Sequence, residues 1–267
     1  MKKENTVSRL KEKLEELYTY YNRREFVHPD PLEFLYNYDD IRDREVVALV
    51  ASSLAYGRVV QILKSVSVIL EIMSLSPYLF LTGISEKKLL NSFEGFKHRF
   101  TTGEDVSCML LAAKNMIAEE GSLLNAFVSG YRDSDKNILP ALSTFVRRLA
   151  KESEGSKNSL IPSPDRGSAC KRLILFLRWM VRKDNVDPGG WKQICPSKLI
   201  IPLDTHMHSI CTGLGMTSRK QADMKTAIEI TDAFKKIVPD DPVKYDFSLT
   251  RLGIRKDADP REFLNSI

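Results

Sequence analysis

Apolar residues recur at helical spacing along almost the whole chain. In residues 44–57 they repeat every three or four positions until Gly57 ends the segment, as in a buried helix of about four turns. The same spacing predicts five further helices, over residues 58–75, 104–120, 137–152, 219–237 and 241–254. No segment alternates between apolar and polar residues as a half-buried strand would. The sequence therefore predicts an all-α protein.

Two irregular stretches interrupt these helices. Residues 153–168 are polar and rich in Ser, Pro and Gly, which predicts a loop or a hinge. Residues 185–202 contain a Pro-Gly-Gly turn and separate a basic helix, residues 170–183, from the segment that follows. The charge and the candidate chemistry of the chain concentrate around these stretches.

Composition changes this picture little. Of the 267 residues, 43% are hydrophobic and 28% are charged, as in ordinary soluble globular proteins. No stretch approaches the roughly 18 uninterrupted apolar residues of a membrane span. The first 18 residues are charged and amphipathic, unlike the apolar core of a signal sequence. We therefore expect a cytoplasmic protein that does not bind membranes.

The net charge of +5 is concentrated in one segment. Residues 1–165 hold 22 Lys/Arg and 23 Asp/Glu, and residues 199–267 hold ten of each. Residues 166–198 hold eight Lys and Arg against only Asp184 and Asp187. A positive field focused in this way attracts a polyanion such as nucleic acid. A solvated face rich in basic residues is the alternative explanation.

Lys171 lies in the first turn of the apolar helix at residues 170–183. Ser168 is the expected N-cap, which would place Lys171 at the third helical position. The positive helix end, the neighbouring Arg172 and apolar neighbours such as Leu175 are features that lower the pKa of a lysine. An amine with a lowered pKa is a usable nucleophile. A lysine that reaches solvent from a core helix is the alternative.

Asp204 follows the apolar residues 200–203 and precedes a short predicted helix, which is a favourable place for an N-cap aspartate. Capping is a sufficient structural explanation for this residue. The helix end also holds the carboxylate in place and keeps it ionised. Such a group suits the stabilisation of positive charge that develops during a reaction.

Together these residues resemble the helix-hairpin-helix DNA glycosylase superfamily, whose members include endonuclease III and the 8-oxoguanine DNA glycosylases. The resemblance covers residues 166–254 and rests on a Gly-containing loop, a lysine that opens an apolar helix, the string LDTH before a helix that runs to LG, and the closing string YDFSLTRLGI. More narrowly, the combination of KRLILFLRWMVR, a D-x-G-x-W-like loop and PLDTH is similar to an uncharacterised bacterial family within that superfamily. The spacing of 33 residues between Lys171 and Asp204 is closer to the archaeal 8-oxoguanine glycosylases than to endonuclease III.

The chain departs from the superfamily pattern in two places. The glycine-rich hairpin that grips phosphate is replaced by SPDRGSAC, which has a single glycine. The four-cysteine iron–sulfur motif is absent, so the resemblance implies no cluster, and we expect no cofactor. The cysteines are spaced too widely for zinc or iron–sulfur ligation, and we expect reduced, mostly buried thiols at Cys108, Cys170, Cys195 and Cys211.

The resemblance implies an activity and roles for two residues. In that superfamily a lysine attacks the sugar carbon that bears a damaged base, and an aspartate assists. Carried over by position, Lys171 is the nucleophile and Asp204 is the assisting carboxylate. The implied function is a DNA base-excision glycosylase with abasic-site lyase activity through a lysine Schiff base. The implied substrates are oxidised purines such as 8-oxoguanine in double-stranded DNA, and no metal is implied.

The resemblance also implies a pocket for an extruded base. Asp246 lies on the helix that faces this pocket in the superfamily, where it could accept hydrogen bonds from the N–H edge of a purine. Thr250, one turn further on, stands where an aromatic residue is expected. An extruded base needs stacking surfaces. Trp179, Trp191 and Tyr56 are candidates, although such residues are more often part of a core.

Basic residues form stripes along the predicted helix beside Lys171, because positions 171, 178 and 182 share one side, as do positions 172, 179 and 183. A cationic side of this kind suits the phosphates of a kinked DNA strand. The expected contacts to the DNA backbone come from Arg166, Arg172, Arg178, Arg182 and Lys183.

The expected architecture is a single discontinuous unit, residues 1–267, with two helical lobes and a cleft between them. One lobe is contiguous, residues 43–185, and the other combines residues 1–42 with residues 199–267. Lys171 and Asp204 should meet across the cleft, with their side chains within several ångströms. The sequence leaves the oligomeric state open, with a monomer as the expectation.

Two other functions stay open. A metal-dependent hydrolase would use Asp204, His206 and His208, but residues two apart on a helix point away from each other. Only Asp204 and His208 would then share a face. A non-catalytic helical module that binds nucleic acid or protein would keep the scaffold and lack the lysine chemistry. Metal analysis and lysine-dependent trapping on DNA distinguish these functions.

Overall fold

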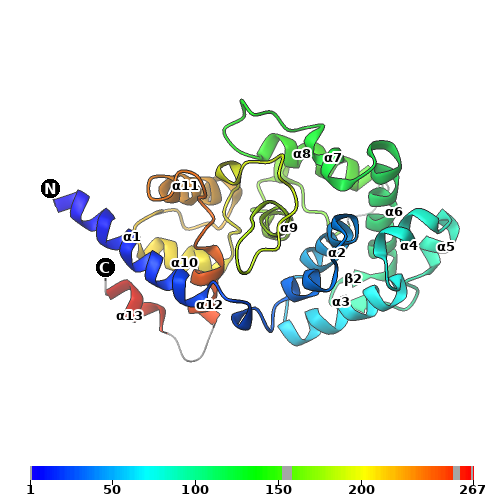
Figure 1. Ribbon diagram of the computed structural model, residues 1–267, viewed down its shortest axis with the longest axis horizontal. Helices are drawn as coiled ribbons and strands as arrows, with labels where there is room; N and C mark the ends of the chain where they lie inside the picture. Colours follow the sequence, from blue (N-terminus) through cyan, green and yellow to red (C-terminus); the bar gives the residue numbers. More distant parts are fainter. Residues whose placement is uncertain (1, 152–157, 255–258, 266) are drawn as a thin grey trace.

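The computed structural model describes residues 2–151, 158–254, 259–265 and 267. Their regular structure is helical apart from one two-stranded hairpin, so the all-α prediction is confirmed (Figure 1). The α-helices are α1 (Lys2–Tyr21), α2 (Ile41–Ser53), α3 (Val59–Met73), α4 (Pro77–Gly83), α5 (Glu86–Asn91), α6 (Gly103–Glu120), α7 (Leu123–Val128), α8 (Leu139–Ala150), α9 (Lys171–Val181), α10 (Thr205–Gly213), α11 (Met224–Lys235), α12 (Asp246–Ile254) and α13 (Pro260–Asn265). The 3-10 helices are η1 (Arg24–Phe26), η2 (Pro31–Asn37), η4 (Pro164–Arg166) and η5 (Pro196–Lys198), and the strands are β1 (Lys97–His98) and β2 (Thr101–Thr102).

The longer helices occur where the hydrophobic period predicts them, and α10 follows Asp204 as expected. The short helices α4, α5, α7 and α13 are absent from the prediction, because six or seven residues are too few to establish a period. Local caps begin two of them instead. Ser76 Oγ accepts a hydrogen bond from Leu79 N at 3.2 Å, and Ser122 Oγ accepts one from Asn125 N at 3.0 Å.

The hairpin of β1 and β2 contradicts the expectation that the chain has no strands. Its two strands pair antiparallel and are two residues long, too short to show an alternating pattern. Arg99, in the turn, has a φ of 55°, in the left-handed region. The buried His98 anchors the hairpin, since its ring nitrogens lie 2.9 Å from Ser65 Oγ on α3 and 3.0 Å from Tyr56 O.

Segments far apart in the sequence lie side by side in the fold. Helix α1 packs against α12, and α10 packs against both α12 and α13 (Figure 1). Helices α2 to α8 gather on the opposite side of the molecule, and α9 lies between the two groups and packs against α2. The segment η2 packs against α2 and α3. The division of the chain into two lobes stays a prediction.

Trp191 belongs to the hydrophobic core. Its ring lies 5.1 Å from the ring of Phe176 on α9 and 5.7 Å from that of Phe127 on α7. Its Nε1 donates to the buried carboxylate of Glu45 at 2.8 Å. The prediction that Trp191 could stack on a base in the cleft is therefore wrong, because the indole is fully enclosed and its polar atom is satisfied inside the protein.

None of the helices in the described part of the chain is by itself long and apolar enough to cross a membrane. Helices α3 and α4 have the length and apolar composition of a membrane span only when they are taken together, and they are bent by 54° relative to each other. The apolar face of α3 is accounted for by the core, where Ile62, Val66 and Ile69 are buried.

Candidate active site

A cleft of about 790 Å³ opens between α9, α10, α12 and the segment that joins α2 to α3. Its walls combine apolar and aromatic side chains with seven charged ones, which are Asp30, Lys171, Arg172, Arg178, Asp204, Asp246 and Arg251. The cleft brings together most of the residues predicted from the sequence, which are Tyr56, Lys171, Arg172, Arg178, Trp179, Asp204 and Asp246.

Lys171 and Asp204 form a direct ion pair in this cleft. Lys171 Nζ donates to Asp204 Oδ2 at 2.6 Å, across 33 residues of sequence. Both side chains are partly accessible, with exposed fractions of 34% for Lys171 and 23% for Asp204. The expected proximity of these two side chains is confirmed.

Helix α9 begins differently from the expectation. Cys170 is the N-cap residue, so Lys171 is the first helical residue and not the third. The expected cap, Ser168, lies outside the helix, where its Oγ accepts from Cys170 N at 3.2 Å. Cys170 has φ 47° and ψ 33°, a left-handed conformation that costs about 1–3 kcal/mol for a residue other than glycine. This turn starts the helix directly at the lysine.

The two oxygens of Asp204 have separate tasks. Oδ1 caps α10 by accepting from Met207 N at 2.8 Å, and Oδ2 accepts from Lys171. Burial raises the pKa of the Asp204 carboxyl, but the Lys171 ammonium and the Met207 N–H outweigh it and hold that pKa below its usual value. Asp204 is therefore a fixed, ionised carboxylate at the wall of the cleft.

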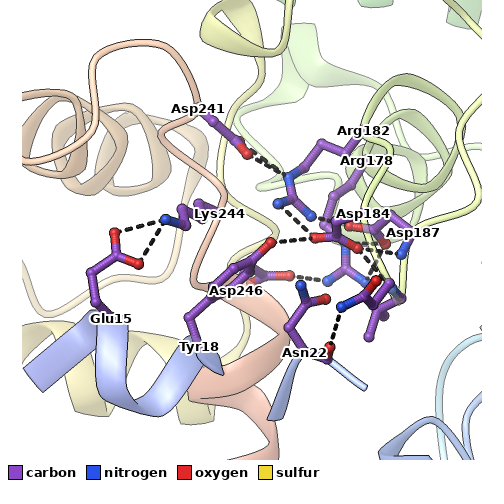
Figure 2. Close-up of polar contacts among 12 residues, drawn as sticks. Glu15, Tyr18, Asn22, Arg178, Arg182, Asp184, Asp187, Asp241, Lys244 and Asp246 are labelled. Atoms are coloured by element: carbon purple, nitrogen blue, oxygen red, sulfur yellow. Dashed lines mark hydrogen bonds and ion pairs between the residues drawn. The ribbon is translucent and has the colours of Figure 1, made fainter. Parts of the chain in front are cut away.

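Asp246 is the first residue of α12 and lies deeper in the cleft. One oxygen, Oδ2, accepts from Arg178 Nη1 (Figure 2). The other oxygen, Oδ1, is buried and has no hydrogen-bond partner among the described residues. Burial raises the pKa of Asp246 to about 6, although the Arg178 guanidinium acts in the opposite direction.

Arg178 and Arg182 are buried, which corrects their prediction as DNA-backbone residues. Each is only 4% exposed. Figure 2 shows both guanidinium groups enclosed by carboxylates. Arg178 pairs with Asp187 and Asp246, and the partners of Arg182 are Asp184, Asp187 and Asp241. Two aspartates from the segment that follows α9 and two from the region where α12 begins thus neutralise Arg178 and Arg182 of the predicted basic stripe.

Arg172 has a structural role as well. Its Nη1 donates to Ser53 O at the end of α2 at 2.7 Å, and its Nη2 donates to Ser159 O. Its guanidinium carbon lies 4.8 Å from the centre of the Tyr56 ring. Of the predicted phosphate contacts, Arg166 and Lys183 are the exposed ones.

Trp179 and Tyr56 give the cleft its predicted aromatic surfaces. Trp179 lines the cleft but is only 1% exposed, so it forms the floor and does not project into the space. The Tyr56 hydroxyl donates to His98 O at 2.9 Å, which fixes its ring beside the cleft. Phe247 on α12 also lines the cleft, and sequence reasoning missed it, because one phenylalanine on an apolar helix has no distinguishing pattern.

Sequence reasoning also missed Arg251, on the same helix. Arg251 lines the cleft and is 3% exposed. Its Nη2 donates to Asp30, and its guanidinium carbon lies 4.6 Å from the centre of the Phe247 ring. Its Nε is buried without a partner among the described residues. Nothing in its neighbourhood of sequence distinguishes this arginine from one on a solvated face.

Two exposed arginines lie beside Gly57 at the rim of the cleft, although neither of them lines it. Arg58 precedes α3, and Arg99 lies in the hairpin turn with its guanidinium carbon 5.8 Å from the centre of the Tyr56 ring. A Cβ on Gly57 would approach Arg99 Cδ to 2.9 Å, and its φ of 96° also favours glycine. Next to Arg99, Phe100 is 74% exposed.

The described residues contain no group of three His, Cys, Asp or Glu side chains that could hold a metal ion. His206 lines the cleft, whereas His208 is 2.8 Å from Arg219 O, outside the cleft. The four cysteines are free thiols, and two of them, Cys170 and Cys211, are buried.

Fold and site together define an all-α protein with a lysine–aspartate pair in the wall of a deep cleft. A family model described as protein of unknown function (DUF2400) matches residues 30–255. The chain belongs to this family. Comparisons with curated proteins and with solved structures found no match.

Proposed function

We propose that this protein is a DNA base-excision glycosylase with abasic-site lyase activity on double-stranded DNA. The observation that carries the proposal is the hydrogen bond of 2.6 Å between Lys171 Nζ and Asp204 Oδ2 in the wall of the cleft. It joins a potential amine nucleophile to an ionised carboxylate, the two groups that the reaction needs. Aromatic walls suited to a flipped base support the proposal.

The proposed reaction begins when the sugar of the damaged nucleotide enters beside the ion pair. The Lys171 ammonium passes a proton to the departing base, whose bond to C1′ breaks with the electron pair leaving on the base. Asp204 stabilises the positive charge that develops on the sugar, and the neutral amine forms a bond to C1′. A proton then moves from the nitrogen to the ring oxygen, the C1′–O4′ bond breaks, and a Schiff base results.

Surface charge supports DNA binding less strongly than the sequence predicts. Arg178 and Arg182 are neutralised internally, so they add nothing to the outer field. The exposed Arg58, Arg99 and Arg166 remain available for phosphate contacts. Binding should therefore depend on salt through a few contacts near the cleft rim.

The alternative is a non-catalytic nucleic-acid-binding or protein-binding module. The observation that favours it is the engagement of Lys171 with Asp204 in the free protein, since the amine must leave this partner to react. Lysine-dependent covalent chemistry separates the two functions, because only the enzyme forms a Schiff base.

Borohydride trapping tests the proposal directly. Reduction of the Schiff base should fix the wild-type protein covalently on duplexes that carry an oxidised purine or a preformed abasic site, as seen on a denaturing gel. Lys171→Gln preserves length and helix propensity and should abolish the adduct. Lys225→Gln, which removes an exposed lysine of α11, is the matched control and should trap normally.

Two results would overturn the proposal. Normal trapping by Lys171→Gln would assign the chemistry to another amine. DNA binding by the wild type without an adduct on any lesion or abasic site would favour the non-catalytic module.

A further inference from the structure

A histidine–glutamate pair lies at the cleft, in the segment that joins α1 to α2. His28 lines the cleft and its side chain is 76% exposed, so a ligand can reach the ring. His28 Nδ1 lies 2.8 Å from Glu33 Oε2. Because a carboxylate only accepts hydrogen bonds, Nδ1 carries the hydrogen and Nε2 is the accepting nitrogen of the neutral ring. A carboxylate that orients a histidine in this way is the usual arrangement of a general base.

The pair is held in place before any ligand arrives. Glu33 Oε2 also accepts from Asp30 N, in the capping box that begins η2. Asp30 in turn accepts from Arg251 Nη2, and Arg251 is a cleft residue of α12. Helix α12 packs against α10, whose first turn Asp204 caps. The wall that carries His28 is therefore joined through α12 to the helix that carries the proposed catalytic carboxylate.

The carboxylates among the described cleft residues are already engaged by cations. The pairs are Asp204 with Lys171, Asp246 with Arg178, and Asp30 with Arg251. A carboxylate beside a cation is a weaker proton acceptor than a free one. The imidazoles of His28 and His206 remain, and within the described part of the chain only the ring of His28 is held by a carboxylate.

The proposed lyase reaction needs such a proton acceptor. The Schiff base on Lys171 is a protonated imine at C1′, and strand cleavage requires the removal of a hydrogen from C2′. A cleft of about 790 Å³ has the size that one small ligand fills. A nucleotide whose sugar reaches Lys171 therefore also meets the wall that carries His28.

We propose that His28 is the general base of the lyase step and that Glu33 is its positioning residue. His28 Nε2 takes the proton from C2′, the C–H electron pair forms a C1′=C2′ bond, and the C1′=N pair moves onto nitrogen. The nitrogen pair then re-forms the C1′=N bond and the C1′=C2′ pair becomes a C2′=C3′ bond. The C3′–O bond breaks, and its electron pair leaves on the 3′-phosphate. Glu33 stabilises the resulting imidazolium. The inference rests on the proposed function and deepens its second step.

The experiment uses a duplex with a preformed abasic site, labelled at the 3′ end of the damaged strand. Elimination releases the labelled fragment, so a borohydride adduct keeps the label only if it was trapped before elimination. His28→Ala should slow strand cleavage by about 10²-fold, within the usual contribution of a general base, and should form the adduct as fast as wild type. The share of adduct that keeps the label should rise. Imidazole added to the solution should restore part of the lost cleavage rate.

A second variant and two controls accompany this measurement. Glu33→Gln should show the same change to a smaller extent, because the ring stays but loses the charge that stabilises the imidazolium. Glu25→Gln removes an exposed carboxylate of the same segment, and His208→Gln removes a histidine outside the cleft. Both controls should leave the cleavage rate and the retained label unchanged.

The readouts separate this inference from the proposed function. Cleavage by His28→Ala at the wild-type rate overturns the inference and leaves the lysine chemistry standing, as does a wild type that is trapped but does not cleave. An equal loss of trapping and cleavage without rescue by imidazole also overturns it, because His28 would then act only in binding. A rise in retained label in His206→Ala, and not in His28→Ala, would make His206 the base. Absence of an adduct in the wild type overturns both proposals. Thermal melting identifies a variant that fails to fold, in which case Glu33→Gln decides.

Discussion

The two ends of helix α9 hold their positive charges in opposite ways. At the N-terminal end, Lys171 has one carboxylate partner, Asp204, and about a third of its side chain is accessible from the cleft. At the C-terminal end, Arg178 and Arg182 are buried and share four aspartates. A charge with a single partner at a cleft wall can exchange that partner for a substrate. Buried charges with several partners cannot, because separating them leaves uncompensated charge in the interior.

The buried C-terminal end of α9 holds distant parts of the fold together. Its aspartates come from the segment that follows α9 and from the region where α12 begins, and Tyr18 on α1 donates to Asp184 at 3.1 Å (Figure 2). The network therefore ties α9 to the two ends of the chain. It also extends to the cleft through Asp246, which links the part of the molecule that holds the fold to the part that would hold a ligand.

The largest expected effect is on stability, from Asp187→Asn. Asp187 accepts from both buried arginines, so its loss leaves two cations short of a partner. The free energy of unfolding should fall by about 3–5 kcal/mol, as measured by urea denaturation. Asp232→Asn, at an exposed position of α11, should change it by less than about 0.5 kcal/mol. A loss below about 1 kcal/mol in Asp187→Asn would show that the network does not hold the fold together.

At the N-terminal end of α9 we expect the opposite result, a large loss of activity with a small loss of stability. Asp204→Asn keeps an N-cap of about equal strength but removes the negative charge. Turnover should fall by about 10²–10³-fold. Stability should change by less than about 1 kcal/mol, since a partly exposed ion pair contributes little. Trapping kinetics and thermal melting measure the two effects. Comparable losses in both would mean that Asp204 is only a helix cap.

The comparison also explains what the sequence can and cannot predict. The helices follow from periodicity, because burial of one face repeats with the helical turn. Lys171 and Asp204 are predictable because each begins a helix and matches a known pattern. Their contact depends on tertiary structure, so the prediction of that contact came from the resemblance and not from local sequence.

The burial and ion pairing of the basic stripe could not be predicted from the sequence. Helical spacing places Arg178 and Arg182 on one side, but it does not say what that side faces. Their partners include Asp241, 59 residues from Arg182, and Asp246, 68 residues from Arg178, and these contacts can be recognised only in the fold. Trp191 presents the same difficulty, because burial against Phe127 depends on tertiary packing. An excess of basic residues along a sequence thus predicts a positively charged surface only where the fold brings no carboxylates against those residues.

Glu45 is a buried carboxylate that has no cationic partner among the described residues. It accepts from the neutral donors Trp191 Nε1, Leu123 N and Leu124 N, and burial raises its pKa to about 7. The folded pKa lies above the unfolded value of about 4.3, so the folded state takes up the proton more readily. Its contribution to stability is complete below about pH 4.3 and is lost as the pH rises through 7.

Replacement of Glu45 by Gln tests this pH dependence. The wild-type free energy of unfolding should decline by roughly 2–3 kcal/mol between pH 5 and pH 7.5 on account of this group. In Glu45→Gln that decline should disappear, and a Glu229→Gln variant at an exposed position of α11 should retain it. Denaturation series at five pH values measure the slope. An unchanged slope in Glu45→Gln would assign the pH dependence to other groups, with Asp246 as the next candidate.

The smallest expected effect concerns the exposed cations at the cleft rim, Arg58 and Arg99. Unlike the two buried arginines, they have no carboxylate partner among the described residues, so they can neutralise DNA phosphates. Each phosphate contact contributes about 0.9 to the slope of log K against log salt concentration. Arg99→Gln should lower the slope measured by fluorescence anisotropy by about one, and Lys225→Gln should leave it unchanged. Equal slopes for Arg99→Gln and wild type would show that this rim does not contact DNA.

Because Arg99 packs against the Tyr56 ring, Arg58→Gln is the cleaner second test. The same decrease in both variants would place the DNA backbone across the mouth of the cleft, beside Lys171.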